Sequence, residues 1–313
     1  LHNQSRRQRQ MCIRDRMPTE EGFVYPRFSF DVKISNQRPL SFRLPIQLEL
    51  FYQQFKNYGD EQGPYVKRLG LQYSNVFRWN QNRSFFDVGL RFELFDESSS
   101  LFQNEIEQRK IKLNLTIDKR NNPLYPNSGV FFQFKLDGYG GVLGGERSFS
   151  KFETDLRVYS NILNTVNVAG RLNLGEIFNW DEDYDQYESI LFEKFYLGGS
   201  NTLRAYKPLK FEQDTISTGV GSDDTLILPF GNTAKLLTNW EIRFPLSEKF
   251  GLVVFYDGGL ISQDLSIVSL DNIFWNRGVG LTYNSPFGPL RIDYGESMNC
   301  LLYTSDAADD SGC

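Results

Sequence analysis

Apolar and polar residues alternate with a period of two along most of this chain. Between positions 86 and 94, for example, Phe86, Val88, Leu90, Phe92 and Leu94 occupy every second position, and the residues between them are charged or glycine. Strict alternation places the apolar side chains on one face of a β-strand. The pattern predicts about twelve strands and no convincing helix, with the strands at residues 24–34, 40–50, 65–79, 86–94, 111–118, 130–137, 152–160, 165–174, 237–246, 250–260, 278–284 and 289–295.

The predicted strands are long, and their polar faces carry many charges. Soluble strands usually have about five or six residues, whereas a tilted strand that crosses a bilayer needs about nine to eleven. The pattern therefore favours an all-β fold, a transmembrane antiparallel up-and-down β-barrel, over a soluble sandwich. We expect the charges to face a water-filled lumen (Arg43, Glu49, Arg91, Lys112) and the apolar set to face lipid (Leu44, Leu48, Leu90, Phe92, Leu113, Leu115).

The predicted connections alternate in length. Short links at 35–39, 80–84, 161–164, 246–249 and 285–288 alternate with long ones at 54–63, 96–109, 138–149, 176–235 and 261–277. Outer-membrane barrels have short periplasmic turns and longer extracellular loops, which produces this rhythm. The link 119–128 breaks it, because it occupies a short position with ten residues. Aromatic residues near predicted strand ends suggest membrane-interface girdles: Phe51, Tyr52, Phe77, Trp79, Phe95, Phe178 and Trp180.

The two ends of the chain do not share this pattern. Residues 11–15 can be encoded by a DNA element whose reverse complement, shifted by one base, encodes residues 300–304, and the element matches a transposon-type sequencing adapter. We therefore treat residues 1–16 and 300–313 as adapter-derived, non-native segments and expect them to lie outside the barrel. Residues 17–299 form the predicted outer-membrane β-barrel domain, which we expect to be incomplete.

Composition then limits the chemistry of the barrel domain. The only His and Cys residues of the chain are His2, Cys12, Cys300 and Cys313, all in the two ends. Disulfides, Cys/His zinc sites and a Ser-His-Asp triad are therefore excluded within 17–299. The formal net charge of −5 gives no sign of a nucleic-acid partner. We expect a protein that is not an enzyme, with no catalytic residue, cofactor or metal.

Two local motifs have ordinary explanations. The acidic cluster Asp181, Glu182, Asp183, Asp185 and Glu188 resembles a calcium loop, but Gln186 and Phe192 stand where such a loop needs Gly and Glu. A solvated loop is the favoured interpretation. The glycine-rich run 138–145 precedes no periodic helix, so a hairpin loop is favoured over a phosphate cradle.

Five segments of the chain resemble, in order, motifs of the BamA/TamA outer-membrane assembly family, also called the bacterial surface antigen family. They are Asp118-Lys119-Arg120 with Pro126 and Gly129, the run 195–206 (FYLGGSNTLRAY), the strand 240–246 (WEIRFPL), the strand 254–259 (VFYDGG) and the hairpin 278–294. The resemblance implies a sixteen-stranded barrel, of which this chain contains the fourth to fifteenth strands. It also implies that the first three strands, the last strand and the POTRA domains are missing.

The same resemblance supplies the site hypothesis. It implies that the tip of the long loop 176–235 tucks into the lumen, with Gly198, Gly199, Arg204, Ala205 and Tyr206 forming the loop motif. Its partner is an inner-wall strand with Phe255, Asp257 and Gly259. A partly desolvated guanidinium needs a carboxylate, so we expect Arg204 to pair with Asp257. Ala205 departs from the glycine that the family usually has after this arginine.

The function that the resemblance implies is insertion, assembly or translocation of proteins at the bacterial outer membrane. The expected partners are outer-membrane lipid, unfolded outer-membrane or secreted proteins, and accessory periplasmic or lipoprotein subunits, with no nucleic acid. A two-partner secretion transporter and a passive porin-like channel remain as alternatives, because the alternation and the loop rhythm fit them equally well. An enzyme on a barrel scaffold is disfavoured by the missing histidine.

Overall fold

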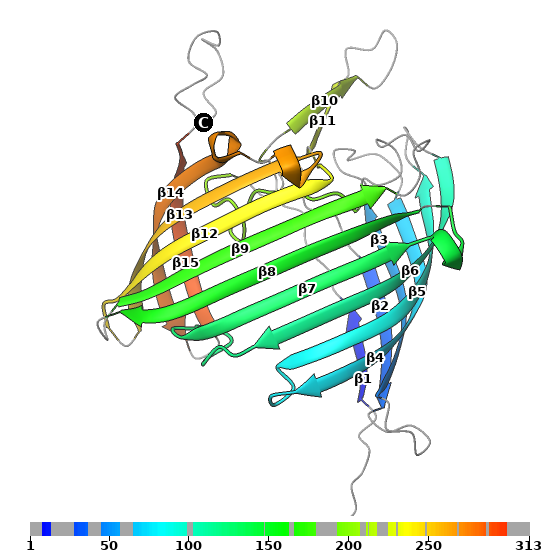
Figure 1. The fold of residues 1–313 in the computed structure, drawn as a ribbon, viewed down its shortest axis with the longest axis horizontal. Helices are drawn as coiled ribbons and strands as arrows, with labels where there is room; N and C mark the ends of the chain where they lie inside the picture. The colour runs from blue at the N-terminus through cyan, green and yellow to red at the C-terminus, as the bar shows by residue number, and fades with distance from the viewer. Residues whose placement is uncertain are drawn as a thin grey trace, which may run out of the picture.

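The computed structural model describes residues 8–13, 28–36, 45–56, 65–98, 103–146, 148–162, 166–179, 193–206, 211, 213–217, 225–229, 231–247, 249–267, 269–285 and 288–298. One curved sheet of thirteen strands dominates it (Figure 1), with each strand antiparallel to its neighbours, in the order β1–β9 and then β12–β15. A separate hairpin, β10 and β11, lies in the long loop at residues 213–217 and 225–229. The sheet strands are β1 (Gln8–Ile13), β2 (Phe28–Asn36), β3 (Ile46–Lys56), β4 (Tyr65–Trp79), β5 (Ser84–Ser98), β6 (Gln103–Asp118), β7 (Gly129–Tyr139), β8 (Phe149–Ile162), β9 (Val166–Asn179), β12 (Ala234–Pro245), β13 (Phe250–Ser262), β14 (Phe274–Ser285) and β15 (Gly288–Ser297).

The twelve strands from β2 to β15 in this sheet confirm the predicted all-β, up-and-down architecture. Each sheet strand between the edge strands β1 and β15 pairs with the sheet strands before and after it, and β9 pairs with β12 because the long loop leaves the sheet between them. The helical segments that the structure describes are 3₁₀ turns: η2 (Gly141–Leu143), η3 (Leu265–Ile267) and η4 (Leu270–Asn272). Among the described residues, no helix has the length and hydropathy to cross a membrane.

One strand lies where none was expected. Residues 8–13 of the predicted adapter-derived end form β1, which pairs with β2 from Phe30 to Ser35. The expectation that residues 1–16 lie outside the sheet is therefore wrong for this segment. The physical reason is that an edge strand presents unpaired N–H and C=O groups, which a neighbouring chain satisfies through its backbone whatever its side chains. The pairing does not bear on the origin of the segment.

The two faces of the sheet have the polarity of a membrane barrel. On β5, Leu94 on the convex face is 56 % exposed and the neighbouring Glu93 on the concave face is 3 % exposed. Leu48, Leu90 and Phe92 share the convex face. Within the concave face, Arg91 pairs with Glu93 (2.8 Å) and Lys112 pairs with Asp87 (2.9 Å). The predicted division into apolar outside and charged inside is confirmed for these residues, whereas Arg43 and Leu44 lie outside the described residues.

Two predicted girdle aromatics lie inside the barrel wall instead. Phe51 and Phe95 are each 2 % exposed, and the guanidiniums of Arg91 and Arg68 lie over their rings at 4.1 and 4.3 Å from the centroid. The strand bounds explain why Phe51 is not at an interface. Strand β3 runs to Lys56, so Phe51 lies in its middle and points inward, as Gln47 and Glu49 do. Phe77, Trp79 and Phe178 are on the convex face as predicted, and Trp180 lies outside the described residues.

One predicted long loop is also wrong. Strands β5 and β6 extend to Ser98 and from Gln103, so most of the link 96–109 is paired strand. The hydrophobic alternation fails there because the convex face becomes polar, with Glu107 and Arg109 forming an ion pair on it. The glycine-rich run around η2 is a hairpin loop between β7 and β8, as predicted.

The sheet stays open among the described strands. It begins at β1 and ends at β15, and these two strands do not pair with each other. The apolar side chains of β15 are correspondingly exposed, with Ile292 at 80 % and Tyr294 at 73 %. The long loop packs against the concave side of the open sheet, and the candidate site lies where the two meet.

Candidate functional site in the lumen

The long loop passes over the concave face between residues 193 and 206. Its tip is a tight turn, in which the Gly199 N–H donates to the Tyr206 carbonyl (2.9 Å) and the Thr202 N–H donates to the Gly199 carbonyl (3.0 Å). Gly198 and Gly199 have φ values of 106° and 100°. Residues with a Cβ rarely adopt this region, so the two glycines allow the chain to reverse here.

The turn places Arg204 against the inner wall, and the predicted contact with Asp257 is present. The Arg204 Nε donates to Asp257 Oδ2 (2.7 Å), and its Nη2 donates to the other carboxylate oxygen, Oδ1. The Arg204 side chain is 4 % exposed and that of Asp257 is 0 % exposed. The guanidinium also lies over the Phe255 ring, 3.7 Å from its centroid. A bidentate pair with a stacked ring fixes both the position and the plane of a guanidinium.

A second carboxylate, Glu241 on β12, completes the binding of Arg204. The third nitrogen, Nη1, donates to Glu241. Burial alone would disfavour the charged guanidinium, but the hydrogen bonds and the charges of Asp257 and Glu241 outweigh it and raise the pKa of Arg204. Arg243 Nε and Arg291 Nη1 also donate to Glu241, at 2.8 and 2.9 Å. One glutamate therefore joins the loop to β12 and β15.

Wall side chains also bind the backbone of the loop tip. Asn239 Nδ2 donates to the Thr202 carbonyl (2.8 Å) and to Asp257 Oδ1 (2.8 Å). Arg171 Nη1 on β9 donates to the Asn201 carbonyl (2.7 Å). These hydrogen bonds go to backbone carbonyls of the loop and do not depend on its side chains, so they position the turn as a whole.

The remaining residues of the two motifs supply packing. Leu203 is fully buried, and a Cβ at Gly259 would lie 2.9 Å from its Cδ1, so a larger residue at position 259 would displace the Leu203 side chain. The Tyr206 hydroxyl hydrogen-bonds to Ser297 Oγ on β15 (2.9 Å). Ala205 does not have a positive φ, which explains why the chain accepts alanine where the family pattern has glycine.

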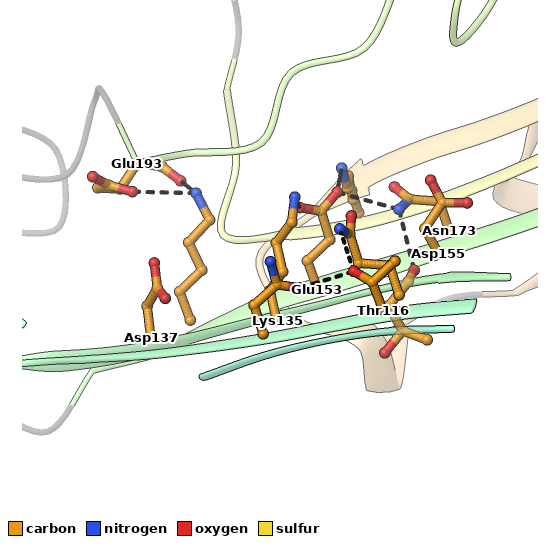
Figure 2. Close-up of polar contacts among 12 residues, drawn as sticks. Thr116, Lys135, Asp137, Glu153, Asp155, Asn173 and Glu193 are labelled. Carbon is orange, nitrogen blue, oxygen red and sulfur yellow. Dashed lines mark hydrogen bonds and ion pairs between the residues drawn. The ribbon is translucent and has the colours of Figure 1, made fainter. Parts of the chain in front are cut away.

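The loop is also anchored at its other end, around residues 193–195 (Figure 2). Lys151 on β8 donates through Nζ to the Glu193 carbonyl (2.5 Å) and to its carboxylate (3.3 Å). Phe195 forms an antiparallel bridge with Asn232, and the ammoniums of Lys151 and Lys235 each lie 4.8 Å from its ring centroid. Burial opposes the charge of Glu193, yet nearby cations led by Lys151 lower its pKa to about 2.

Between the loop tip and the wall lies a cavity of about 620 Å³. It is lined by arginines and acids of the wall and by polar residues of the loop, among them Arg157, Arg171, Glu241, Asp293, Ser200 and Asn201. Arg157 and Arg171 share Asp155, with each ion pair at 2.8 Å. The lumen around the loop is therefore polar and largely charge-paired.

The ten-residue link 119–128 reaches the same network from the end of the barrel with short links. Arg243 Nη1 donates to the Pro126 carbonyl (3.0 Å), although the two residues lie 117 positions apart. The Arg243 guanidinium also lies 5.6 Å from the Tyr125 ring centroid. The unusual length of this link thus serves to reach β12 from the β6–β7 connection.

Four residues of this site were not predicted from the sequence: Glu241, Arg243, Arg291 and Glu193. Alternation did place Asn239, Glu241 and Arg243 on the polar face of their strand, so a signal for them existed. Nothing in the sequence paired Glu193 with Lys151. The acidic cluster 181–188 lies outside the described residues.

Comparisons with known proteins agree with this architecture. The family model for the Omp85 superfamily domain matches residues 23–300. The outer membrane protein assembly factor BamA of Nitratidesulfovibrio vulgaris (strain Hildenborough) is 24 % identical over 214 residues, which cover 66 % of this chain and 26 % of that protein. This chain therefore spans about a quarter of the length of that relative.

Two solved structures are also similar. The crystal structure of Haemophilus ducreyi BamA lacking POTRA domains 1–3 aligns with a TM-score of 0.66 and 14 % identity over 87 % of this chain and 59 % of that one. CdiB from Acinetobacter baumannii aligns with a TM-score of 0.48 and 11 % identity, over 88 % and 54 %. The first of these shows a shared barrel fold. Given the match over nearly its whole length, the chain belongs to the Omp85 superfamily and is a protein of the bacterial outer membrane.

Proposed function

We propose that the protein whose barrel includes this chain assists the insertion and assembly of proteins into the outer membrane, and that it is not an enzyme. The observation that carries the proposal is the loop tip held in the lumen by Arg204, Asp257 and Glu241. A docked loop occupies the lumen that a passive channel leaves open. The similarity to a protein named as an assembly factor supports the same class of function.

The physical means would be strand pairing at a seam. A strand edge in lipid has unpaired backbone groups, and each unsatisfied group costs several kcal/mol. An incoming substrate strand would satisfy them by β-augmentation. The docked loop would hold β12, β13 and β15 in register while this happens, because Arg204 and Glu241 tie these strands together.

A reconstitution experiment tests the proposal. The full-length protein in liposomes should convert an added urea-unfolded outer-membrane protein into its protease-resistant membrane form, and Arg204→Ala should reduce that yield. Arg277→Ala is the matched control, because Arg277 lies on β14 with its side chain 65 % exposed. Substrate delivered as a soluble species into the liposome would favour a secretion transporter. A large steady conductance with no conversion of substrate would favour a porin-like channel.

A further inference from the structure

A small basic cavity lies at the rim of the barrel, at the short-link end of β4, β5 and β6. It has a volume of about 360 Å³ and is lined by Trp79, Asn80, Arg83, Ser84, Lys119 and Arg120. It is separate from the lumenal cavity, since the two cavities have no lining residue in common. Its lining has a fixed frame, a surplus of positive charge and an aromatic side chain on the lipid side.

Asp118 supplies the fixed frame. Its carboxylate accepts from Arg83 Nη2 (3.0 Å) and from Arg120 Nε and Nη2 (both 2.9 Å). Its backbone N–H donates to Ser84 Oγ (3.0 Å). The two guanidiniums are thereby held in place, and their side chains are 26 % and 13 % exposed. Arg83 Nε is buried and has no hydrogen-bond partner among the described residues.

The charge of this frame is not balanced. Two arginines share the single Asp118 carboxylate, so one positive charge remains on the frame. Lys119 adds another, because its exposed ammonium has no ion pair within the described part of the chain. The whole chain has a net charge of −5, so this rim departs in sign from the rest of the molecule. Such a cluster attracts an anion, and a phosphate accepts hydrogen bonds from several cations at once.

The position of Trp79 indicates which anion. Trp79 is 43 % exposed on the convex face, and directly below it Phe77 and Phe86 are exposed as a cross-strand pair. Tryptophan at the end of a membrane-crossing strand is typical of the membrane–water interface, where acyl chains lie on one side of the ring and headgroups on the other. Short links of outer-membrane barrels lie on the periplasmic side. The cavity therefore lies at the level of the headgroups of the periplasmic leaflet.

We propose that this rim cavity binds the phosphate of an anionic phospholipid. Lys119 and Arg83 would contact the phosphate oxygens, and Trp79 would lie beside the glycerol backbone. The acyl chains would run along the apolar strip of Phe77 and Phe86. A free phosphate has no part that uses this strip, so the lipid accounts for more of the surface.

Native mass spectrometry on the full-length protein tests the site. The delipidated protein in detergent is titrated with phosphatidylglycerol and, separately, with phosphatidylcholine of the same acyl chains. We expect a preference for phosphatidylglycerol that Lys119→Glu lowers about tenfold, the effect of about 1.4 kcal/mol from one charge-assisted contact. Trp79→Ala should weaken the binding of both lipids, because its contact is apolar.

Lys249→Glu is the matched control. Lys249 is an exposed lysine in the β12–β13 turn at the same end of the barrel, so the variant makes the same charge change away from the cavity. An equal loss with Lys249→Glu, or equal affinity of the unmodified protein for the two lipids, would overturn the proposal. Displacement of phosphatidylglycerol by inorganic phosphate alone would show a free-anion site and would overturn the lipid assignment. Should Lys119→Glu fail to fold, Lys119→Gln gives the same comparison with a smaller expected loss.

Discussion

The long loop is anchored at two points, and the charges at these points are opposite in sign. At residues 193–195 the loop supplies a carboxylate and an aromatic ring, and the wall supplies Lys151 and Lys235. At the tip the loop supplies the guanidinium of Arg204, and the wall supplies Asp257 and Glu241. A loop that slipped or docked in reverse would bring like charges together, so the two anchors specify one orientation.

The anchors also differ in geometry. The Lys151 ammonium is a point charge on a flexible stem, which tolerates small displacements of its partner. The guanidinium of Arg204 is a planar fork that engages two carboxylates and a ring at once. We therefore expect the tip to be the stiff anchor, sensitive to small chemical changes, and residues 193–195 to be the tolerant one.

Removing the Asp257 carboxylate, which binds the loop tip, should have the largest effect on stability. Asp257→Ala leaves the buried guanidinium of Arg204 with Glu241 and, at 4.0 Å, with Asp293, and breaking a buried pair in this way costs about 3–5 kcal/mol. The unfolding temperature of the full-length protein, followed by heat-modifiable gel migration, should fall accordingly. Asp271→Ala, at an exposed aspartate of η4, is the control. Equal effects of the two variants would show that the tip is not an energetic anchor.

A charge-conserving change at the tip should have the next largest effect. Arg204→Lys keeps the charge but cannot reproduce the fork, and we expect a loss of about 1.5–3 kcal/mol. Combined with Asp257→Asn, the double variant should cost less than the sum of the single ones, because the two residues share one interaction. This double-mutant cycle is measured twice, once on the unfolding temperature and once on the yield of inserted substrate. Strictly additive effects would contradict the coupling.

The tolerant anchor should respond to pH. The pKa of Glu193 is lowered from 4.5 to about 2, so its stabilising charge is fully present above pH 4.5 and is lost as the pH falls toward 2. Glu193→Gln should cost about 1–2 kcal/mol at neutral pH. The difference in unfolding temperature between this variant and the unmodified protein should persist down to about pH 4.5 and shrink below it. A difference that disappears between pH 7 and pH 5 would rule out this ion pair as its source.

The smallest effect should come from weakening the contact between Arg243 and the link 119–128. Arg243→Lys can keep an ion pair with Glu241 but loses the fork that also reaches Pro126, at a cost of about 1 kcal/mol. Hydrogen exchange of the amides in 119–128 should become faster while that of the loop tip changes little. Arg277→Lys, at an exposed site on β14, is the control. Unchanged exchange in 119–128 would show that the contact does not hold the link.

The sequence by itself determined the strands and their two faces. Alternation is a local property, since each residue shows its parity through its immediate neighbours, and it assigned Leu90 to lipid and Glu49 to the lumen without any tertiary information. The pairing of Arg204 with Asp257 was also accessible, but only through the family resemblance, which implied that the loop motif meets the inner-wall strand of Asp257.

Only the tertiary structure decided which residues meet across the lumen. The curvature of the sheet and the stagger of its strands bring Arg243 to Pro126 and three arginines to Glu241, and neither quantity is visible in a period-two pattern. The strand bounds behave similarly: Phe51 is an inner residue because β3 extends to Lys56, and residues 8–13 join the sheet because β2 has an open edge. Pairing through backbone groups carries no side-chain signature, so the sequence could not have revealed it.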